Sequence, residues 1–186
     1  ATLAGKIRDE LGRKLDLMDP NKFEFCIIKD FPMYEWNEEE EKYDFTHNPF
    51  NNPKGGSKAL ENENIDEIVA EQFDFVCNGV EMASGAVRNH DPEVMKKAFA
   101  VVGLGEDVIE EKFGALYTAF QYGAPPHAGM APGIDRMLMM LLDEDSIRET
   151  IAFPLNANGA DSLMQAPSDI SELQLREAHI KIREKN

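Results

Sequence analysis

The order of strand-like and helical segments is the strongest constraint on the fold of this chain. Apolar strand-like runs at 23–32 (FEFCIIKDFP) and 73–82 (FDFVCNGVEM) lie far apart, and helical patterns follow over 92–102 and 106–120. Strands that alternate regularly with helices indicate a parallel sheet, and this chain lacks that spacing. We therefore predict an α+β fold with a largely antiparallel sheet flanked by helices.

Shorter segments complete the predicted order of elements. Leu or Ile recurs every fourth residue near the start of the chain, which predicts an amphipathic helix over 2–17. The run ASGAVRNH (83–90) either continues the second strand or pairs with it. The small residues of AGMAPG (128–133) predict a buried strand, because they let neighbouring strands approach closely. A buried helix rich in Met and Leu is predicted directly after it, and a last helix within 170–184.

Two polar stretches predict loops. The acidic run 37–41 lies between Trp36 and Tyr43 and predicts the solvated tip of a hairpin. Residues 48–64 are rich in Asn, Pro and Gly, which predicts a long loop. A loop of this length within a compact domain is often functional or mobile.

The charge balance restricts the kinds of partner. The chain has 35 acidic and 19 basic residues and a formal net charge of −16. Phosphate backbones are bound by Lys and Arg, so this segment is not expected to hold nucleic acid by itself. No apolar run reaches the roughly 18 residues of a membrane span, and the charged N-terminus lacks the apolar centre of a signal peptide. A first residue other than Met leaves open that the sequence is a piece of a longer chain.

The two cysteines, Cys26 and Cys77, lie inside apolar strand-like runs. Such positions are typical of reduced core thiols rather than of a disulfide or a metal site. Reduced thiols fit a reducing compartment, so we predict a cytoplasmic protein with no membrane partner.

One arginine, Arg136, lies at the start of the Met- and Leu-rich helix, in the run GIDRMLMM. A guanidinium there is costly to bury unless an anion meets it. The free N–H groups and dipole of a helix N-terminus attract anions, Gly133 allows close approach of a ligand, and Pro132 stiffens the entry. These features predict a phosphate or carboxylate site. An internal ion pair with Asp135 or with an acid at 143–145 explains the arginine equally well.

The run NGVEMASGAVR (78–88) contains a second candidate pair, Glu81 and Arg88. Seven residues separate them, so on one straight strand they point to opposite faces of the sheet. Gly85 is a candidate for a β-bulge that brings both onto one face. In that case Arg88 can bind a carboxylate through two hydrogen bonds, and Glu81 can bind a metal or an ammonium group. The alternative is an exposed Glu and Arg that flank a hairpin turn.

His47, in THNPF, lies between the acidic hairpin and a proline turn. A single histidine is more often a packed or exposed side chain than a catalyst. For His47 the structural and the catalytic interpretation both stay open. His90 and His127 are weaker candidates, because each lies beside Asp or Pro and can cap a turn.

Several motifs together resemble the class II aminoacyl-tRNA synthetases. The run GAPPHAGMAPGIDR, followed by SIRETIAFP, resembles the third signature motif of that class. The ordered set DFPMYEW, HNPF, NGVE, SGAVR and IAFP is similar to the bacterial type of aspartyl-tRNA synthetases. The similarity extends over essentially the whole chain from Phe23 onward. Such an ordered series is far more specific than any one motif.

The resemblance implies an ATP site. Four consecutive residues match the ATP-binding end of the third motif, with Arg136 on the phosphates; they are Gly133, Ile134, Asp135 and Arg136. Glu81 matches an acid that contacts ATP, through Mg²⁺. Arg136 and Glu81 are therefore the expected catalytic residues.

The resemblance also implies an amino-acid site. Arg88 matches the arginine that holds the side-chain carboxylate of aspartate, and His47 matches a histidine close to the bound substrate. The implied reaction forms aspartyl-adenylate and pyrophosphate from aspartate and ATP, then transfers the aspartate to tRNA. Positioning and charge neutralisation, rather than proton transfer, account for the first step. Asparagine would leave the guanidinium of Arg88 without its counter-charge, which predicts discrimination against it.

The chain departs from the family pattern in several places. The run 82–86 (MASGA) replaces a glycine-richer one, so the predicted bulge depends on Gly85 alone. Asn48 replaces a second His of many relatives, and no role is assigned to it. We find neither the first motif, which builds the dimer interface, nor the second, whose Arg binds ATP and the substrate carboxylate. We find no anticodon-binding β-barrel in the 186 residues either.

We therefore predict that the chain is part of an aspartate–tRNA ligase. Residues 1–22 would be the end of an inserted domain or a linker helix, and 23–186 the C-terminal half of the catalytic domain, running to its natural end. The fragment alone should be inactive or nearly so, and the full-length homodimer would act on L-aspartate, ATP and tRNA. One alternative is a stand-alone paralogue that senses ATP or an amino acid. Another is a lysyl-tRNA synthetase, which Arg88 argues against because it repels a cationic substrate.

Overall fold

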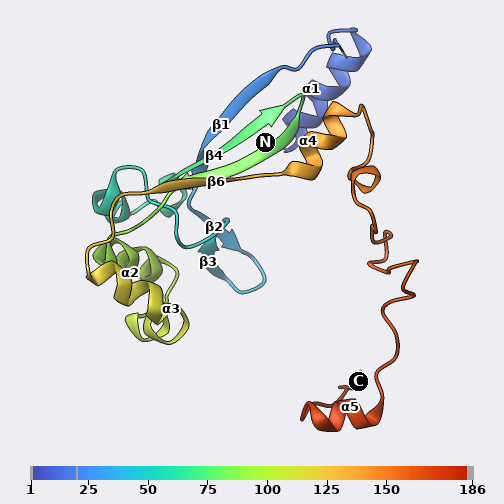
Figure 1. Ribbon diagram of the computed structural model, residues 1–186. Helices are drawn as coiled ribbons and strands as arrows, with labels where there is room; N and C mark the ends of the chain where they lie inside the picture. Colours follow the sequence, from blue (N-terminus) through green and yellow to red (C-terminus); the bar gives the residue numbers. More distant parts are fainter. Residues whose placement is uncertain (1, 20, 184–186) are drawn as a thin grey trace. The chain divides into compact units, whose positions relative to one another are not determined.

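The computed structural model describes residues 2–19 and 21–183, which divide into two compact units between Ile134 and Asp135 (Figure 1). The first unit contains an antiparallel sheet, a hairpin and the longer helices. The second contains short helices joined by loops. The predicted α+β class with an antiparallel sheet is confirmed.

The sheet of the first unit has four strands in the order β1-β4-β5-β6, each antiparallel to its neighbour. The strands are β1 (Phe25–Pro32), β4 (Val69–Cys77), β5 (Val80–Val87) and β6 (Ala128–Pro132). The two apolar runs of the sequence pair directly, with Phe25 opposite Cys77 and Ile28 opposite Asp74. Figure 1 shows β1, β4 and β6 alongside one another.

The second apolar run turns back on itself at Asn78-Gly79. Both residues have positive φ, 49° and 83°, which is the backbone that a two-residue type I′ hairpin turn requires. The predicted single strand over 73–82 is therefore wrong, because β4 and β5 lie on either side of this turn. The prediction that 83–90 belongs to a strand that continues or pairs with the second run is confirmed.

The hairpin and two helices form the most deeply buried part of the first unit. They are β2 (Tyr34–Asn37), β3 (Lys42–Phe45), α2 (Pro92–Val101) and α3 (Glu106–Gln121). The acidic run lies at the hairpin turn, and both helices lie where the sequence predicts them. The core residues in these elements and in the segments packed against them are 9% exposed or less, and include Met33, Tyr34, Ile68, Ala70, Met95, Ala98, Phe99, Val102, Ile109, Tyr117 and Phe120.

Two polar side chains fix the start and the packing of α2. The side chain of Asp91 accepts hydrogen bonds from the N–H groups of Glu93 and Val94, at 2.8 and 3.3 Å, and so caps the helix. The Tyr34 hydroxyl donates to Ala98 O at 3.0 Å and connects the hairpin to the helix. Burial raises the pKa of the Tyr34 phenol above its ordinary value.

Three segments that the sequence predicts to be buried are exposed. The outer strand β6 is exposed along its whole length, and α4 (Ile134–Leu141) contains no buried residue. Cys26 lies on the exposed outer strand β1, whereas Cys77 is buried, and both thiols are free as predicted. β1 and β6 are the outer strands of the sheet and have a neighbour on one side only, so their apolar composition did not place them in the core.

The predicted N-terminal helix is present as α1 (Thr2–Lys14). Its apolar face is exposed, since Leu3, Ile7, Leu11 and Leu15 retain 50–72% of their accessible surface. Helical periodicity therefore predicted the helix correctly but did not predict whether its apolar face is buried.

The second unit contains most of α4, a 3₁₀ turn at Ile147–Thr150 and α5 (Glu172–Glu177). Ser171 and Gln174 form a capping box at the start of α5. This helix is shorter than the predicted 170–184, of which residue 184 lies outside the described residues. In the part of the chain that the structure describes, every helix is too short or too polar to cross a membrane.

Candidate functional site

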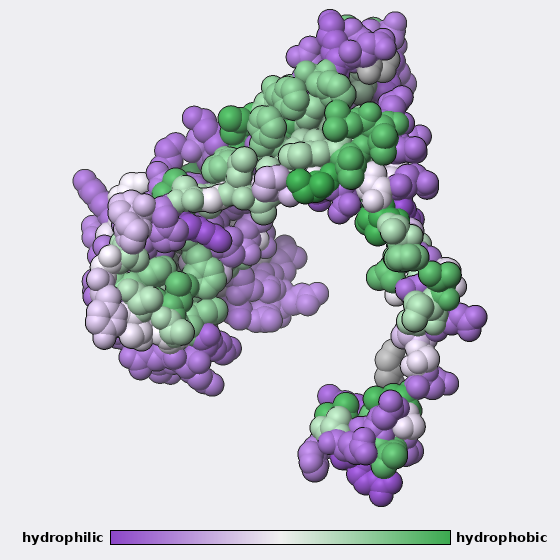
Figure 2. Space-filling model, in the orientation of Figure 1, coloured by the Kyte–Doolittle hydropathy of each residue, from purple (hydrophilic) through white to green (hydrophobic). Residues whose placement is uncertain are grey.

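The two faces of the sheet carry different side chains. Residues opposite each other on antiparallel strands point to the same face, so the register assigns each residue to a face. The face that we call polar carries Gln72, Asp74, Glu81, Ser84, Ala86 and Arg88, beside the apolar Ile28 and Val76. The apolar face carries Phe25, Ile27, Phe73, Phe75 and Met130. Figure 2 shows apolar side chains over the strands of this unit.

A β-bulge at Met82 places Glu81 and Arg88 on the same face. The register of β4 against β5 shifts between Phe75 and Val76, which leaves Met82 as an extra residue of β5. One extra residue reverses the alternation of side chains, so the odd spacing of the two charged residues becomes an even one. The structure thus contains a bulge with the predicted effect.

Gly85, where the sequence predicts the bulge, has a different role. A Cβ there would lie 2.6 Å from Phe73 Cζ, 2.7 Å from Gly129 O and 2.8 Å from Met130 Cβ. Two of these atoms belong to the β6 backbone or are attached to it, so they cannot move aside without moving the strand. Gly85 therefore permits the close approach of β5 and β6, and the predicted position of the bulge is wrong.

A cavity of about 420 Å³ lies on the polar face. It brings together two of the predicted site residues, His47 and Arg88, from different segments of the chain. The other residues that line it are Asn48, Asn51, Gln72, Ser84, Gly85, Ala86, Gly129, Met130 and Ala131. Small residues on β5 and β6 leave room for a ligand, and the polar residues offer both donors and acceptors.

The predicted loop 48–64 supplies part of the cavity wall. Its first residues lie between the start of β4 and the end of β5, where Asn51 bridges to Arg88 and Pro53 bridges to Ala70. Later residues form short 3₁₀ helices at Gly56–Glu61 and Ile65–Glu67. The loop is therefore tied to the sheet at the cavity.

Arg88 is held through both its backbone and its side chain. Its N–H donates to His127 O at 2.9 Å, and its Nη1 donates to Asn48 Oδ1 at 3.4 Å. Asn48 Oδ1 also accepts from the N–H of Phe50 at 3.0 Å, which fixes the orientation of the amide. Asn48, whose role was not predictable from the sequence, thus orients Arg88. A guanidinium has five N–H donors, so this one contact leaves others for a ligand.

His47 lies at the cavity and is exposed. Its ring packs edge-on against Phe31, with the ring centroids 5.5 Å apart and an angle of 84° between the planes. An edge contact of this kind orients the imidazole. A role for His47 beside a bound substrate stays a prediction.

Sequence reasoning missed three polar residues of the site. Asp74 Oδ1 and Asn51 Oδ1 are buried without a hydrogen-bond partner, and Asn51 Nδ2 donates to Gln72 Oε1 at 2.9 Å. A signal for two of them was present, because Gln72 and Asp74 alternate with Phe73 and Phe75. This period of two is typical of a strand with one polar face.

The predicted ATP-binding run is divided between the two units. Gly133 and Ile134 belong to the first unit, and Gly133 N–H donates to Met82 O at 2.8 Å, so the bulge also positions the end of β6. Asp135 and Arg136 belong to the second unit and lie in the first turn of α4. Arg136 is half-buried there, and its contact with a phosphate stays a prediction.

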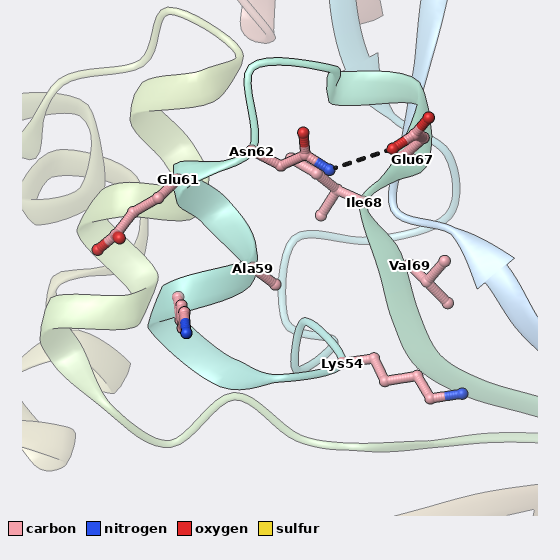
Figure 3. A pocket seen from close by; sticks show the side chains of 8 residues that line it. Lys54, Ala59, Glu61, Asn62, Glu67, Ile68 and Val69 are labelled. Atoms are coloured by element: carbon pink, nitrogen blue, oxygen red, sulfur yellow. Dashed lines mark hydrogen bonds between the residues drawn. The ribbon is translucent and has the colours of Figure 1, made fainter.

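A larger cavity, of about 510 Å³, contains none of the predicted site residues (Figure 3). It is lined by Lys54, Lys58, Ala59, Glu61, Asn62, Glu67, Ile68 and Val69. Lys54 is paired with Asp30 at 2.5 Å, and Asn62 Nδ2 donates to Glu67 Oε2 at 3.5 Å. Its lining charges are of both signs and lie at the surface, so we assign the candidate site to the smaller cavity.

The family described as tRNA synthetases class II (D, K and N) matches residues 6–157. This match covers most of the chain, which therefore belongs to the class II tRNA synthetases. The chain is 58% identical over 179 residues to the aspartate–tRNA(Asp/Asn) ligase of Phenylobacterium zucineum, covering 96% of this chain and 30% of that protein. It is 51% identical over 181 residues to the aspartate–tRNA ligase of Streptomyces coelicolor, covering 97% and 31%. The chain thus spans about 30% of the length of these curated relatives.

Solved structures agree with this family at the level of the fold. An aspartyl-tRNA synthetase from Entamoeba histolytica aligns with a TM-score of 0.54 at 24% identity, over 82% of this chain and 26% of that one. A putative aspartyl-tRNA synthetase from Leishmania major Friedlin aligns with a TM-score of 0.55 at 20% identity, over 87% and 26%. The antiparallel sheet and its helices therefore have the fold of class II synthetases.

Proposed function

We propose that the protein to which this chain belongs is an aspartate–tRNA ligase. In this proposal residues 23–186 are the C-terminal half of the catalytic domain, and residues 1–22 end an inserted domain or form a linker helix. The observation that carries the proposal is the cavity on the polar face, where Asn48 orients Arg88 toward a space of small-molecule size. It is supported by 51–58% identity to curated aspartate–tRNA ligases.

Arg88 binds the side-chain carboxylate of L-aspartate in this proposal. Small residues around it admit the substrate, and His47 contacts the bound amino acid from the rim. A guanidinium–carboxylate pair is charge-assisted and directional. Asparagine has no charge to offer, so it leaves Arg88 desolvated without a counter-ion and binds far less well.

ATP is the second substrate, and its phosphates bind at the start of α4. The run 133–136 forms that site, with Arg136 and the helix N-terminus meeting the phosphate charge. One oxygen of the α-carboxylate of aspartate attacks the α-phosphorus of ATP. The bond from that phosphorus to the oxygen that bridges to the β-phosphate breaks, and pyrophosphate leaves. Aspartyl-adenylate then passes its aspartate to the terminal ribose of tRNA.

Mg²⁺ fits two carboxylates of the polar face. Glu81 and Asp74 lie on the same face, and Asp74 Oδ1 is buried without a hydrogen-bond partner. Magnesium typically binds one or two carboxylates together with substrate phosphates and waters, so a pair of acids is sufficient. When bound, the ion neutralises phosphate charge as pyrophosphate leaves.

The remaining partners belong to the complete protein. A net charge of −16 leaves this chain poorly suited to bind tRNA by itself, so we place most tRNA contacts outside it. A homodimer in the cytoplasm completes the proposal.

The test is aspartate-dependent exchange of pyrophosphate into ATP by the complete protein, followed by charging of tRNA. We expect Arg88→Ala to lower kcat/KM for aspartate at least about 100-fold, because it removes a charge pair from a desolvated site. ATP binding should be retained. Arg8→Ala, a change of an exposed arginine on α1, is the matched control.

Two outcomes would contradict the proposal. Aspartate activation that survives in Arg88→Ala would show that the specificity assignment is wrong. Aspartate binding without exchange or charging would instead indicate a sensor of the amino acid.

The 186-residue chain alone should show weak or no calorimetric binding of ATP and aspartate.

A further inference from the structure

Two amide side chains lie beside Arg88 on the polar face. Asn51 is 2% exposed and Gln72 is 6% exposed, and both line the cavity together with Arg88. Buried amides lower stability unless all their polar atoms are hydrogen-bonded. Their position in the wall of a cavity therefore suggests a role toward a ligand.

Backbone pairing brings these residues together from three segments. Gln72 of β4 lies opposite Ala86 of β5, and Arg88 is two residues further along on the same face. Asn51, from the loop, forms an isolated bridge with Arg88. Gln72 and Asn51 are therefore both next to the strand position that presents the guanidinium.

The hydrogen bond between the two amides sets the direction of Gln72. Asn51 Nδ2 donates to Gln72 Oε1 at 2.9 Å, so the carbonyl end of Gln72 is occupied. Its NH₂ end, which can only donate, is the end available to a ligand. An acceptor that enters the cavity meets this group together with the N–H donors of Arg88.

The side chain of Asn51 is not fully hydrogen-bonded by other groups of the protein. Asn51 Oδ1 is buried and has no hydrogen-bond partner. Asn51 therefore makes its hydrogen bond to Gln72 through its NH₂ group alone, and this bond fixes the orientation of the Gln72 side chain. A buried amide oxygen without a hydrogen bond lowers the stability of the fold. The retention of such an oxygen in Asn51 therefore favours a functional reason for the pair.

We propose that Gln72 is a specificity-determining residue that donates a hydrogen bond to the same carboxylate as Arg88, and that Asn51 is the positioning residue that holds it. The identity of that carboxylate, the side chain of aspartate, rests on the proposed function. A carboxylate accepts from both groups at once, whereas the carboxamide of asparagine turns its own NH₂ toward one of them. Gln72 thus adds to the discrimination that Arg88 provides.

The complete protein should be assayed by pyrophosphate exchange with aspartate and with asparagine. Gln72→Leu removes the donor at similar size, and we expect the KM for aspartate to rise about tenfold or more, as for a lost hydrogen bond to a charged group. The KM for ATP should not change. The preference for aspartate over asparagine should fall, because only Arg88 remains to enforce it.

Changes of Asn51 test the positioning role with a readout that a purely structural residue would not alter. Asn51→Asp places a carboxylate where the amide donor was, so Gln72 turns its NH₂ toward the new carboxylate and its carbonyl toward the substrate. We expect the preference for aspartate over asparagine to fall further than in Asn51→Ala. Equal preference in both variants would overturn the positioning role.

Controls separate folding from recognition. Gln121→Leu makes the same change at an exposed residue of α3 and should leave both KM values unchanged, and the Tm of every variant is measured. An unchanged KM for aspartate and an unchanged preference in Gln72→Leu would overturn the proposal. If the wild-type protein shows no aspartate-dependent exchange, the proposed function fails. Calorimetry with aspartate then decides the role of Gln72: weaker binding by Gln72→Leu supports it, and equal binding overturns it.

Discussion

The helical end of the first unit and the polar face of its sheet differ in the kinds of side chain that they bury. The helical end, formed by α2, α3 and the hairpin β2–β3, buries mainly apolar side chains such as Phe99. Its buried tyrosine Tyr34 donates to a carbonyl, whereas Thr46 Oγ1, directly after β3, is buried without a partner. The polar face buries Asn51 and contains carboxylate and amide oxygens that lack partners. Apolar burial stabilises a fold, whereas unpaired buried polar atoms destabilise it. The comparison indicates that the helical end supplies stability and the polar face is arranged for a ligand.

One strand, β4, connects the two regions. Ala70, near its start, and Ile68, just before it, belong to the core under the helices. Gln72 and Asp74, the next residues on the same face as Ala70, line or flank the cavity side of the sheet. A rigid core at one end of a strand therefore positions ligand-facing residues further along it.

The largest expected effect is a loss of folding stability on substitution in the helical end. Phe99→Ala should lower the free energy of unfolding by about 3–5 kcal/mol, because it leaves a cavity among packed aromatic rings. Phe99 contacts Phe45 and Phe113 at centroid distances of 5.3 and 5.6 Å. Trp36 is the only tryptophan of the sequence and lies on β2 beside this core, so its fluorescence during urea unfolding of the 186-residue chain measures the change.

The control for Phe99→Ala is the same substitution at an exposed phenylalanine. Phe153 is 68% exposed in the second unit, so Phe153→Ala should leave the Trp36 transition unchanged. An equal loss of stability in the two variants would mean that the helical end is not the stabilising region.

A smaller effect is expected in the sheet. Gly85→Ala places a Cβ 2.7 Å from Gly129 O and 2.8 Å from Met130 Cβ, and overpacking of this kind costs about 1–3 kcal/mol. Cys77 reports on the sheet, since burial and the negative charge of Glu24 raise the pKa of its thiol and keep it unreactive. In a Cys26→Ser background, Gly85→Ala should speed the labelling of Cys77 by a thiol reagent.

Gly129→Ala is the matched control for this change, because a Cβ at Gly129 meets no atom within 4 Å. It should leave Cys77 protected. Faster labelling in Gly129→Ala than in Gly85→Ala would contradict the close approach of β5 and β6 at Gly85.

The smallest expected effect concerns Tyr34. Tyr34→Phe removes its hydrogen bond to Ala98 O and should lower the free energy of unfolding by about 1 kcal/mol at neutral pH. Burial raises the pKa of Tyr34 in the folded state, so its contribution is present below the unfolded pKa of about 10 and is lost as pH rises above it. Urea unfolding at increasing alkaline pH should therefore show a shallower decline in Tyr34→Phe. Tyr122→Phe, at a tyrosine 89% exposed, should follow the wild type.

The sequence predicted those elements whose signals are local. Helical periodicity located α1, a proline after Asp91 marked the start of α2, and α3 was predicted directly after it. The hairpin at Asn78-Gly79 also has a strong local signal, which the continuous apolar run on both sides obscured. His47 and Arg88 were found because their residue types stand out in polar turns and small-residue runs, and both line the cavity.

Other features of the site depend on segments that are distant in sequence. The bulge at Met82 follows from the register of β5 against β4 and has no signature in its own residues. Asn48 contacts a residue 40 positions away, and Asn51 contacts one 21 positions away. An amide side chain has no preferred partner until the fold supplies one, so the sequence could not assign these roles.

The sequence by itself determined the class of fold, the order of its elements and the family to which the chain belongs. The tertiary structure decided which apolar segments are buried, since β6, α4 and Cys26 are exposed despite their composition. It also decided which face of the sheet each charged residue occupies. Local periodicity reflects neighbours within one turn or one strand, whereas burial and register reflect contacts between segments that only folding brings together.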